Sequence, residues 1–130
     1  LINQIGRKRL IVLDYEANAG ESIRKTLGPF IDILRAADEE IAILVISKIR
    51  YAEELHNPGQ LKSAQARAKF QEDLVKARRV AGDSNIHFLD GGSLLGEHAD
   101  EGTVDGVHPT AFGFMKMANA IEPAIKEILK

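Results

Sequence analysis

The sequence predicts an α/β fold of three layers, a parallel sheet covered by helices. Three observations support it: short apolar runs alternate with longer segments of helical periodicity, polar residues follow each apolar run, and a helix closes the chain. Alternating strands and helices form parallel sheets, because each crossover helix returns the chain to the same end of the sheet. The 130 residues suffice for a single core, so residues 1–130 are expected to form one domain.

The three predicted strands are short apolar runs bounded by polar or charged residues. They are residues 9–15 (RLIVLDY), 41–47 (IAILVIS) and 85–89 (NIHFL). Runs of this kind are typical of strands buried on both faces of a parallel sheet. Three strands leave two open edges, whereas a strand as apolar as residues 10–13 is normally central. We therefore expect the sheet to be incomplete, with strands missing on its N-terminal side.

Three helices are predicted from apolar residues spaced three and four apart. Gly28-Pro29 either kinks the first helix or starts a shorter one, Gly82 is a plausible end for the second, and Pro123 should kink the third. The apolar positions expected to face the core are Ile23, Leu27, Phe30, Ile31 and Leu34; Phe70, Leu74, Ala77 and Ala81; and Phe114, Ala118, Ile121, Ile125 and Ile128. The second helix is expected to begin near Leu61.

Composition excludes several classes of function. The net charge of -2 and the lack of a basic arm argue against a nucleic-acid partner. The longest apolar run, residues 41–46, is far shorter than the roughly 20 residues of a membrane-spanning helix, so no membrane span is expected. The absence of cysteine removes disulfides, thiolate metal sites and cysteine nucleophiles, although it does not settle the compartment.

The loop before the last predicted helix carries the clearest chemical signal. It ends in Asp105-Gly106-Val107-His108-Pro109. Pro109 disfavours helical geometry at His108, and the flexible Gly106 lets Asp105 turn back toward the imidazole. Such a pair can act as a general base, because the imidazole takes a proton while the carboxylate fixes its tautomer. The same residues also make an ordinary turn and helix start, so spacing alone leaves both interpretations open.

Asn18 is the second candidate, since it follows the first predicted strand. Ligands of open parallel sheets bind beyond the carboxyl ends of the strands, which would bring Asn18, Asp105 and His108 to one rim. The Asn18 amide could donate to a developing oxyanion, or it could simply close a turn through its own backbone.

A nucleophile and a metal site are both missing from the pattern. The serines are Ser22, Ser47, Ser63, Ser84 and Ser93. Ser93 follows the third strand in a glycine-rich stretch, but it lies in the same loop as its supposed partners and lacks the strand-turn-helix that exposes a strained serine. His98 and Asp100 are too few ligands to indicate a metal. We therefore expect no nucleophile in this chain and no metal.

Two blocks of the sequence together resemble the SGNH hydrolases, also called GDSL-type esterases and lipases. Residues 105–109, with Thr110 and Gly113, are similar to the last block of this family, whose aspartate and histidine belong to a catalytic triad. Residues 13–19 (LDYEANA) are similar to its third block, whose asparagine binds the oxyanion, although Glu16 stands where a glycine is usual. The Gly-Asp-Ser block with the nucleophile and the second, glycine-bearing block have no counterpart, and they would precede Leu1.

This resemblance implies a flavodoxin-like SGNH fold, with residues 1–130 forming a partial domain from the third block to the C-terminal helix. A serine supplied from upstream would attack an acyl ester of a small molecule or carbohydrate. His108 would be the base, Asp105 would orient it, Asn18 would bind the oxyanion, and no metal or organic cofactor would be needed. The chain alone is expected to be inactive. Its expected partner is the missing N-terminal segment, or a second copy along the open sheet edge.

The subgroup that the chain resembles most is bacterial, and its SGNH domain often follows a small β-rich domain. A secreted or periplasmic location is compatible with that resemblance.

Residues 9–27 also resemble the start of a response-regulator receiver domain, which has a similar length and parallel sheet. That domain needs an acidic cluster for Mg²⁺ and a phosphoacceptor aspartate at the end of a later strand. Asp14 is followed by Tyr15 rather than a second acid, although Asp90 ends the third predicted strand. A receiver-like signalling or binding module is therefore the alternative.

Overall fold

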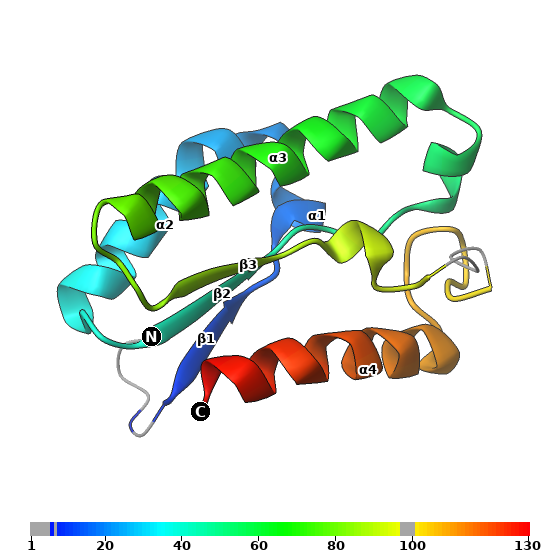
Figure 1. Cartoon of the computed structure of the whole chain (residues 1–130). Helices are drawn as coiled ribbons and strands as arrows, with labels where there is room; N and C mark the ends of the chain where they lie inside the picture. Colours follow the sequence, from blue (N-terminus) through cyan, green and yellow to red (C-terminus); the bar gives the residue numbers. More distant parts are fainter. Residues whose placement is uncertain (1–5, 7, 97–100) are drawn as a thin grey trace.

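The protein folds as a three-stranded parallel sheet with helices on both faces (Figure 1), as seen in a computed structural model that describes residues 6, 8–96 and 101–130. The elements in chain order are β1 (Leu10–Leu13), α1 (Glu16–Ala19), η2 (Gly20–Ser22), α2 (Ile23–Ala37), β2 (Ala42–Ile46), η3 (Ala52–Leu55), α3 (Pro58–Val80), β3 (Ile86–Leu89), η4 (Gly91–Ser93) and α4 (Ala111–Ile128). The α/β class predicted from the sequence is confirmed.

The strands lie in the order β1-β2-β3, and both pairs are parallel. Leu10 pairs with Ala42 at one end of the β1–β2 ladder, and Ile43 pairs with Ile86 in the β2–β3 ladder. In the described part β1 pairs only with β2 and lies at an edge of the sheet, which agrees with the expectation of an open edge beside the first strand. Val12 on this edge strand is 42% exposed.

Helices α2 and α3 cover one face of the sheet (Figure 1). This face contains the larger core, which comprises Ile11, Leu13, Ile23, Leu27, Ile31, Leu34, Ile41, Ile43, Val45, Val75 and Ile86. Helix α2 continues through Pro29, so Pro29 does not start a shorter helix. Pro29 is exposed, so the carbonyl group that its missing N–H leaves free can be hydrated.

Helix α3 begins earlier than expected, because the Asn57 side chain caps it by accepting from the backbone N–H groups of Gly59 (3.1 Å) and Gln60 (3.2 Å). Its predicted buried face is partly wrong. Ala77 is exposed, whereas Gln71 is buried with Val75. Gln71 is buried because its Nε2 donates to the carboxylate of Glu16 (2.7 Å), a polar contact that the apolar pattern does not reveal.

Helix α4 covers the other face of the sheet (Figure 1), and Gly113 is the one residue of this helix that is buried. Met117, Ile121, Ile125 and Ile128 pack against the second core, formed around Leu44, Ile46, Ile49, Leu94 and Leu95. Phe114 and Ala118, expected to face the core, are exposed instead.

The carboxyl ends of all three strands meet at one edge, where the loops after β1, β2 and β3 lie (Figure 1). At the opposite edge the Arg35 guanidinium holds the Asp83 carboxylate through two bonds of 2.8 Å each. None of the helices in the described ranges has the length and hydropathy that crossing a membrane requires.

Candidate active site

The turn at residues 105–108 is built around the Asp105 carboxylate. Its Oδ1 accepts hydrogen bonds from the backbone N–H groups of Val107 (3.0 Å) and His108 (2.8 Å). Gly106 makes this return possible at φ 85°, a left-handed conformation that favours glycine. Its Oδ2 lies 2.7 Å from Nδ1 of His108. The Asp105 carboxylate therefore closes the turn and also contacts the imidazole. This geometry is compatible both with an ordinary turn before a helix and with a general-base pair.

This contact determines the protonation of the pair. The pKa of Asp105 falls from its usual 3.8 to about 2, because the backbone N–H of His108 binds the carboxylate, followed by the imidazole of His108 and the backbone N–H of Val107. The carboxylate is therefore ionised at neutral pH and accepts from Nδ1–H of the ring. The His108 side chain is 77% exposed, and its Nε2 has no hydrogen-bond partner within the described ranges, so it can accept a proton.

Backbone contacts hold the turn from three sides. The Val104 N–H donates to the His108 carbonyl (2.8 Å), and the Thr110 N–H donates to the Gly102 carbonyl (2.9 Å). The third contact comes from another loop, where the Ala52 N–H in η3 donates to the Gly106 carbonyl (2.8 Å). The connection between β2 and α3 therefore supports the turn that carries His108.

The start of α4 fixes the same turn through a close approach of two glycines. The Thr110 hydroxyl caps the helix by accepting from the Gly113 N–H (3.0 Å). A methyl group added at Gly113 would lie 2.0 Å from the Gly102 carbonyl oxygen. Only glycine allows the helix to lie this near to the segment that precedes Asp105.

Asn18 lies in the one-turn helix α1, directly after β1. Its side chain is exposed, and no hydrogen bond joins it to Asp105 or His108 among the residues placed in the structure. The structure therefore brings Asp105 and His108 together and leaves Asn18 on the loop after β1, at the same edge of the sheet.

The serines of the chain do not contact the imidazole. The Ser47 hydroxyl donates to Asp90 (3.0 Å), Ser63 pairs with Arg67 and Glu21, and Ser22 and Ser93 bond to backbone carbonyls. Ser84 precedes β3, at the amino end of the strand. His98 and Asp100 lie outside the described residues. Among the residues that the structure describes, no group of three or more acidic or histidine side chains is arranged to hold a metal ion.

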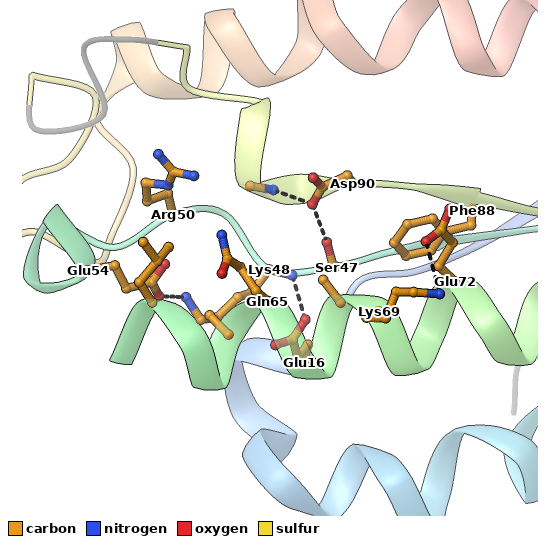
Figure 2. A pocket seen from close by; sticks show the side chains of 14 residues that line it. Glu16, Ser47, Lys48, Arg50, Glu54, Gln65, Lys69, Glu72, Phe88 and Asp90 are labelled. Atoms are coloured by element: carbon orange, nitrogen blue, oxygen red, sulfur yellow. Dashed lines mark hydrogen bonds and ion pairs between the residues drawn. The ribbon is translucent and has the colours of Figure 1, made fainter. Parts of the chain in front are cut away.

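A pocket of about 300 Å³ lies between α3 and the ends of β2 and β3 (Figure 2). Its charged walls are largely paired with one another, as Lys48 is with Glu54 and Ser47 is with Asp90. Neither His108 nor Asn18 lines it. Asp105 and His108 instead lie on an exposed turn.

Glu16 is the residue at this edge that sequence reasoning missed. In the sequence this position stands out only because the family usually has a glycine there, yet Glu16 is 1% exposed and lines the pocket (Figure 2). The sequence gives one faint signal, an acid just after a buried strand and within reach of polar residues on the facing helix.

Comparison with known proteins identifies the class. The structure has a parallel sheet, polar loops at its carboxyl edge and an Asp–His turn before the last helix. The sequence model of the GDSL-like lipase/acylhydrolase family matches residues 1–126. The chain therefore belongs to this family.

Two solved structures share the fold. A GDSL-like lipase from Bacteroides ovatus ATCC 8483 superposes with a TM-score of 0.85 at 25% identity, covering 98% of this chain and 38% of that one. A salicylyl-acyltransferase from a tetracycline biosynthetic pathway superposes with a TM-score of 0.76 at 19% identity, covering 98% of this chain and 39% of that one. The chain thus spans well under half the length of either. No curated protein matches the sequence.

The family assignment confirms the resemblance read from the two sequence blocks. The receiver-like alternative receives no support, because the family match covers almost the whole chain.

Proposed function

We propose that this chain contributes His108, Asp105 and Asn18 to the active site of a serine-dependent acyl-ester hydrolase. The observation that carries the proposal is the 2.7 Å contact between Nδ1 of His108 and Oδ2 of Asp105, combined with a ring that is 77% exposed. An imidazole held at Nδ1 and free at Nε2 is the arrangement that a general base requires.

In the proposed reaction, a serine hydroxyl from residues upstream of Leu1 attacks the ester carbonyl. Nε2 of His108 takes the hydroxyl proton, and the ionised Asp105 stabilises the imidazolium through Nδ1–H. The Asn18 amide donates to the oxyanion of the tetrahedral intermediate. When the intermediate collapses, Nε2 returns the proton to the leaving alcohol. Water then hydrolyses the acyl-enzyme with the same base, and no metal or organic cofactor takes part.

The substrate that fits this chemistry is an acyl ester of a small-molecule alcohol or a carbohydrate. The family description as lipase/acylhydrolase supports the ester class. The exposed position of His108 supports a substrate that approaches from solvent.

The segment that would bring the serine is proposed to pair with the open edge of β1. Three features support this partner. β1 pairs only with β2 in the described part, Val12 beside that edge is 42% exposed, and Phe114 of α4 is 58% exposed. A strand added to β1 would cover Val12 and end at the same carboxyl edge as the loop with Asn18.

The proposed function is tested with p-nitrophenyl acetate. The chain of residues 1–130 should hydrolyse this ester no faster than its His108→Ala variant, because it lacks the nucleophile. In the protein with its upstream residues, His108→Ala should lower kcat/KM by about 10⁴-fold or more. His56→Ala is the matched control, since His56 is also exposed but lies outside the site. Near-normal turnover by His108→Ala would refute the proposal.

A further inference from the structure

Glu16 is a buried carboxylate two residues before the proposed oxyanion donor Asn18. It begins α1, and its side chain is fully enclosed between the end of β1 and helix α3. A charge removed from water is costly unless it is paired and hydrogen-bonded. Both of its oxygens are indeed occupied, which indicates that this position is specified and not incidental.

Three donors from two other elements hold the carboxylate. Oε1 accepts from Nε of Arg67 (2.9 Å). Oε2 accepts from the backbone N–H of Lys48 (2.9 Å) and from Nε2 of Gln71 (2.7 Å), and Figure 2 shows the contact with Lys48. Arg67 and Gln71 are one turn apart on α3, and Lys48 follows β2. Glu16 is therefore fixed at once to the central strand and to the covering helix.

The same arginine also holds the chain beyond Asn18. Nη1 of Arg67 donates to Oε1 of Glu21 (3.0 Å) in η2 and to the Ser63 hydroxyl (2.8 Å). Asn18 thus lies between two anchors, Glu16 and Glu21, that share one guanidinium. A four-residue helix cannot hold its own position, because a single turn is unstable without outside contacts.

We propose that Glu16 is a positioning residue, which fixes the one-turn helix α1 so that the Asn18 amide is held in place at the carboxyl edge of the sheet. This inference rests on the proposed function, in which that amide binds the oxyanion. A donor stabilises a transition state only if it is oriented before charge develops, so a loosened α1 would lower kcat and leave ground-state binding nearly unchanged.

A buried ion pair could instead serve stability alone, and a double-mutant cycle separates the two roles. In the protein that shows His108-dependent esterase activity, Asn18→Ala is expected to lower kcat about 100-fold or more. Glu16→Gln is expected to lower kcat by about 10-fold or more with KM within about 3-fold, because it loses the charge that holds Arg67. In the Asn18→Ala background, Glu16→Gln should cost less than about 3-fold, since its effect passes through Asn18.

Gln71→Met is the milder second variant if Glu16→Gln folds poorly. It removes one donor to Oε2 and leaves the contact with Arg67 intact. It should lower kcat several-fold and show the same coupling to Asn18→Ala. The control is Arg35→Gln, which breaks the half-buried pair with Asp83 at the opposite edge of the sheet. It should lower the melting temperature, leave kcat unchanged and show no coupling to Asn18.

Backbone ¹⁵N relaxation of the same variants gives a readout independent of activity. Residues 16–19 should have order parameters of about 0.85 in the parent and values toward 0.6 in Glu16→Gln and Gln71→Met. Unchanged order parameters would overturn the positioning role. The positioning role would also be overturned if the kcat losses of Glu16→Gln and Asn18→Ala multiplied fully in the double variant. That result would leave the proposed function standing as long as His108→Ala is inactive. Full activity of His108→Ala would overturn the proposed function itself, while the relaxation experiment would still decide whether Glu16 fixes α1.

Discussion

Replacing Gly113 by alanine tests the packing that holds the Asp105–His108 turn. The added methyl group would lie 2.0 Å from the Gly102 carbonyl oxygen and 3.0 Å from its carbon. Ordinary contacts begin near 3.4 Å, so helix and loop must separate by roughly 1 Å or more. The obstacle is backbone, which cannot rotate away as a side chain could.

Two opposing effects set the magnitude of this change. Overpacking costs about 1–3 kcal/mol, and a clash with backbone lies at the upper end of that range. Alanine favours the helix over glycine by about 1 kcal/mol. The net loss in the free energy of unfolding is therefore about 2 kcal/mol, which corresponds to a fall in melting temperature of roughly 6–12 °C for a domain of this size.

The assay is thermal and urea unfolding followed by circular dichroism, with Gly28→Ala as the control. Gly28 lies inside α2, where an added methyl group meets no atom within 4 Å, so the change should be smaller than about 1 kcal/mol. The imidazole NMR signals of His108 should also move in Gly113→Ala, because the Thr110–Gly102 and Val104–His108 bonds lie in the displaced segment. A variant that melts within 2 °C or so of the parent, with unchanged imidazole signals, would refute the reasoning.

Three further predictions follow from contacts at the same edge and from the exposed face. In a ¹³C NMR titration, Asp105 should titrate near pH 2, and His108→Ala should move that pKa upward without restoring 3.8, because the backbone N–H groups of Val107 and residue 108 still bind the carboxylate. Since the folded pKa lies below the unfolded one, Asp105 contributes stability above about pH 4 that is lost as the pH falls toward 2; titration at an unshifted pKa would contradict the contact. Phe114→Ser should reduce the self-association of the chain seen by light scattering and change its stability by less than about 0.5 kcal/mol, whereas a parent chain that is already monomeric and melts cooperatively would argue against an uncovered β1 face. Asn57→Ala should destabilise the fold by about 1 kcal/mol in urea unfolding, because it removes the cap of α3, and an unchanged midpoint would show that the cap is dispensable.

The sequence predicts the parts of this fold that depend on local pattern. The apolar runs locate all three strands to within a few residues, and alternation with helices gives their parallel order. The Asp105–His108 contact is also local, since Gly106 permits the left-handed backbone of the turn and Pro109 disfavours helical geometry at His108.

The parts that the sequence does not predict depend on distant partners. Which apolar positions of α4 are covered depends on the second core that the helix packs against, and the periodicity of α4 does not distinguish the covered Ile121 from the exposed Phe114. The role of Glu16 needs Lys48, Arg67 and Gln71, which lie 32, 51 and 55 residues away along the chain. An acidic residue among polar loop residues has the same local sequence whether its side chain is exposed to solvent or buried.

The hydrogen bond from Ala52 to Gly106 makes the β2–α3 connection a structural support for the turn that carries His108, the proposed general base. Redesign of residues 51–56 toward a new substrate must therefore keep an amide hydrogen at position 52. Proline at position 52 would remove the donor to the Gly106 carbonyl and weaken the turn that holds His108. A substitution in this loop that is chosen for specificity would therefore also change the rate of the proposed reaction.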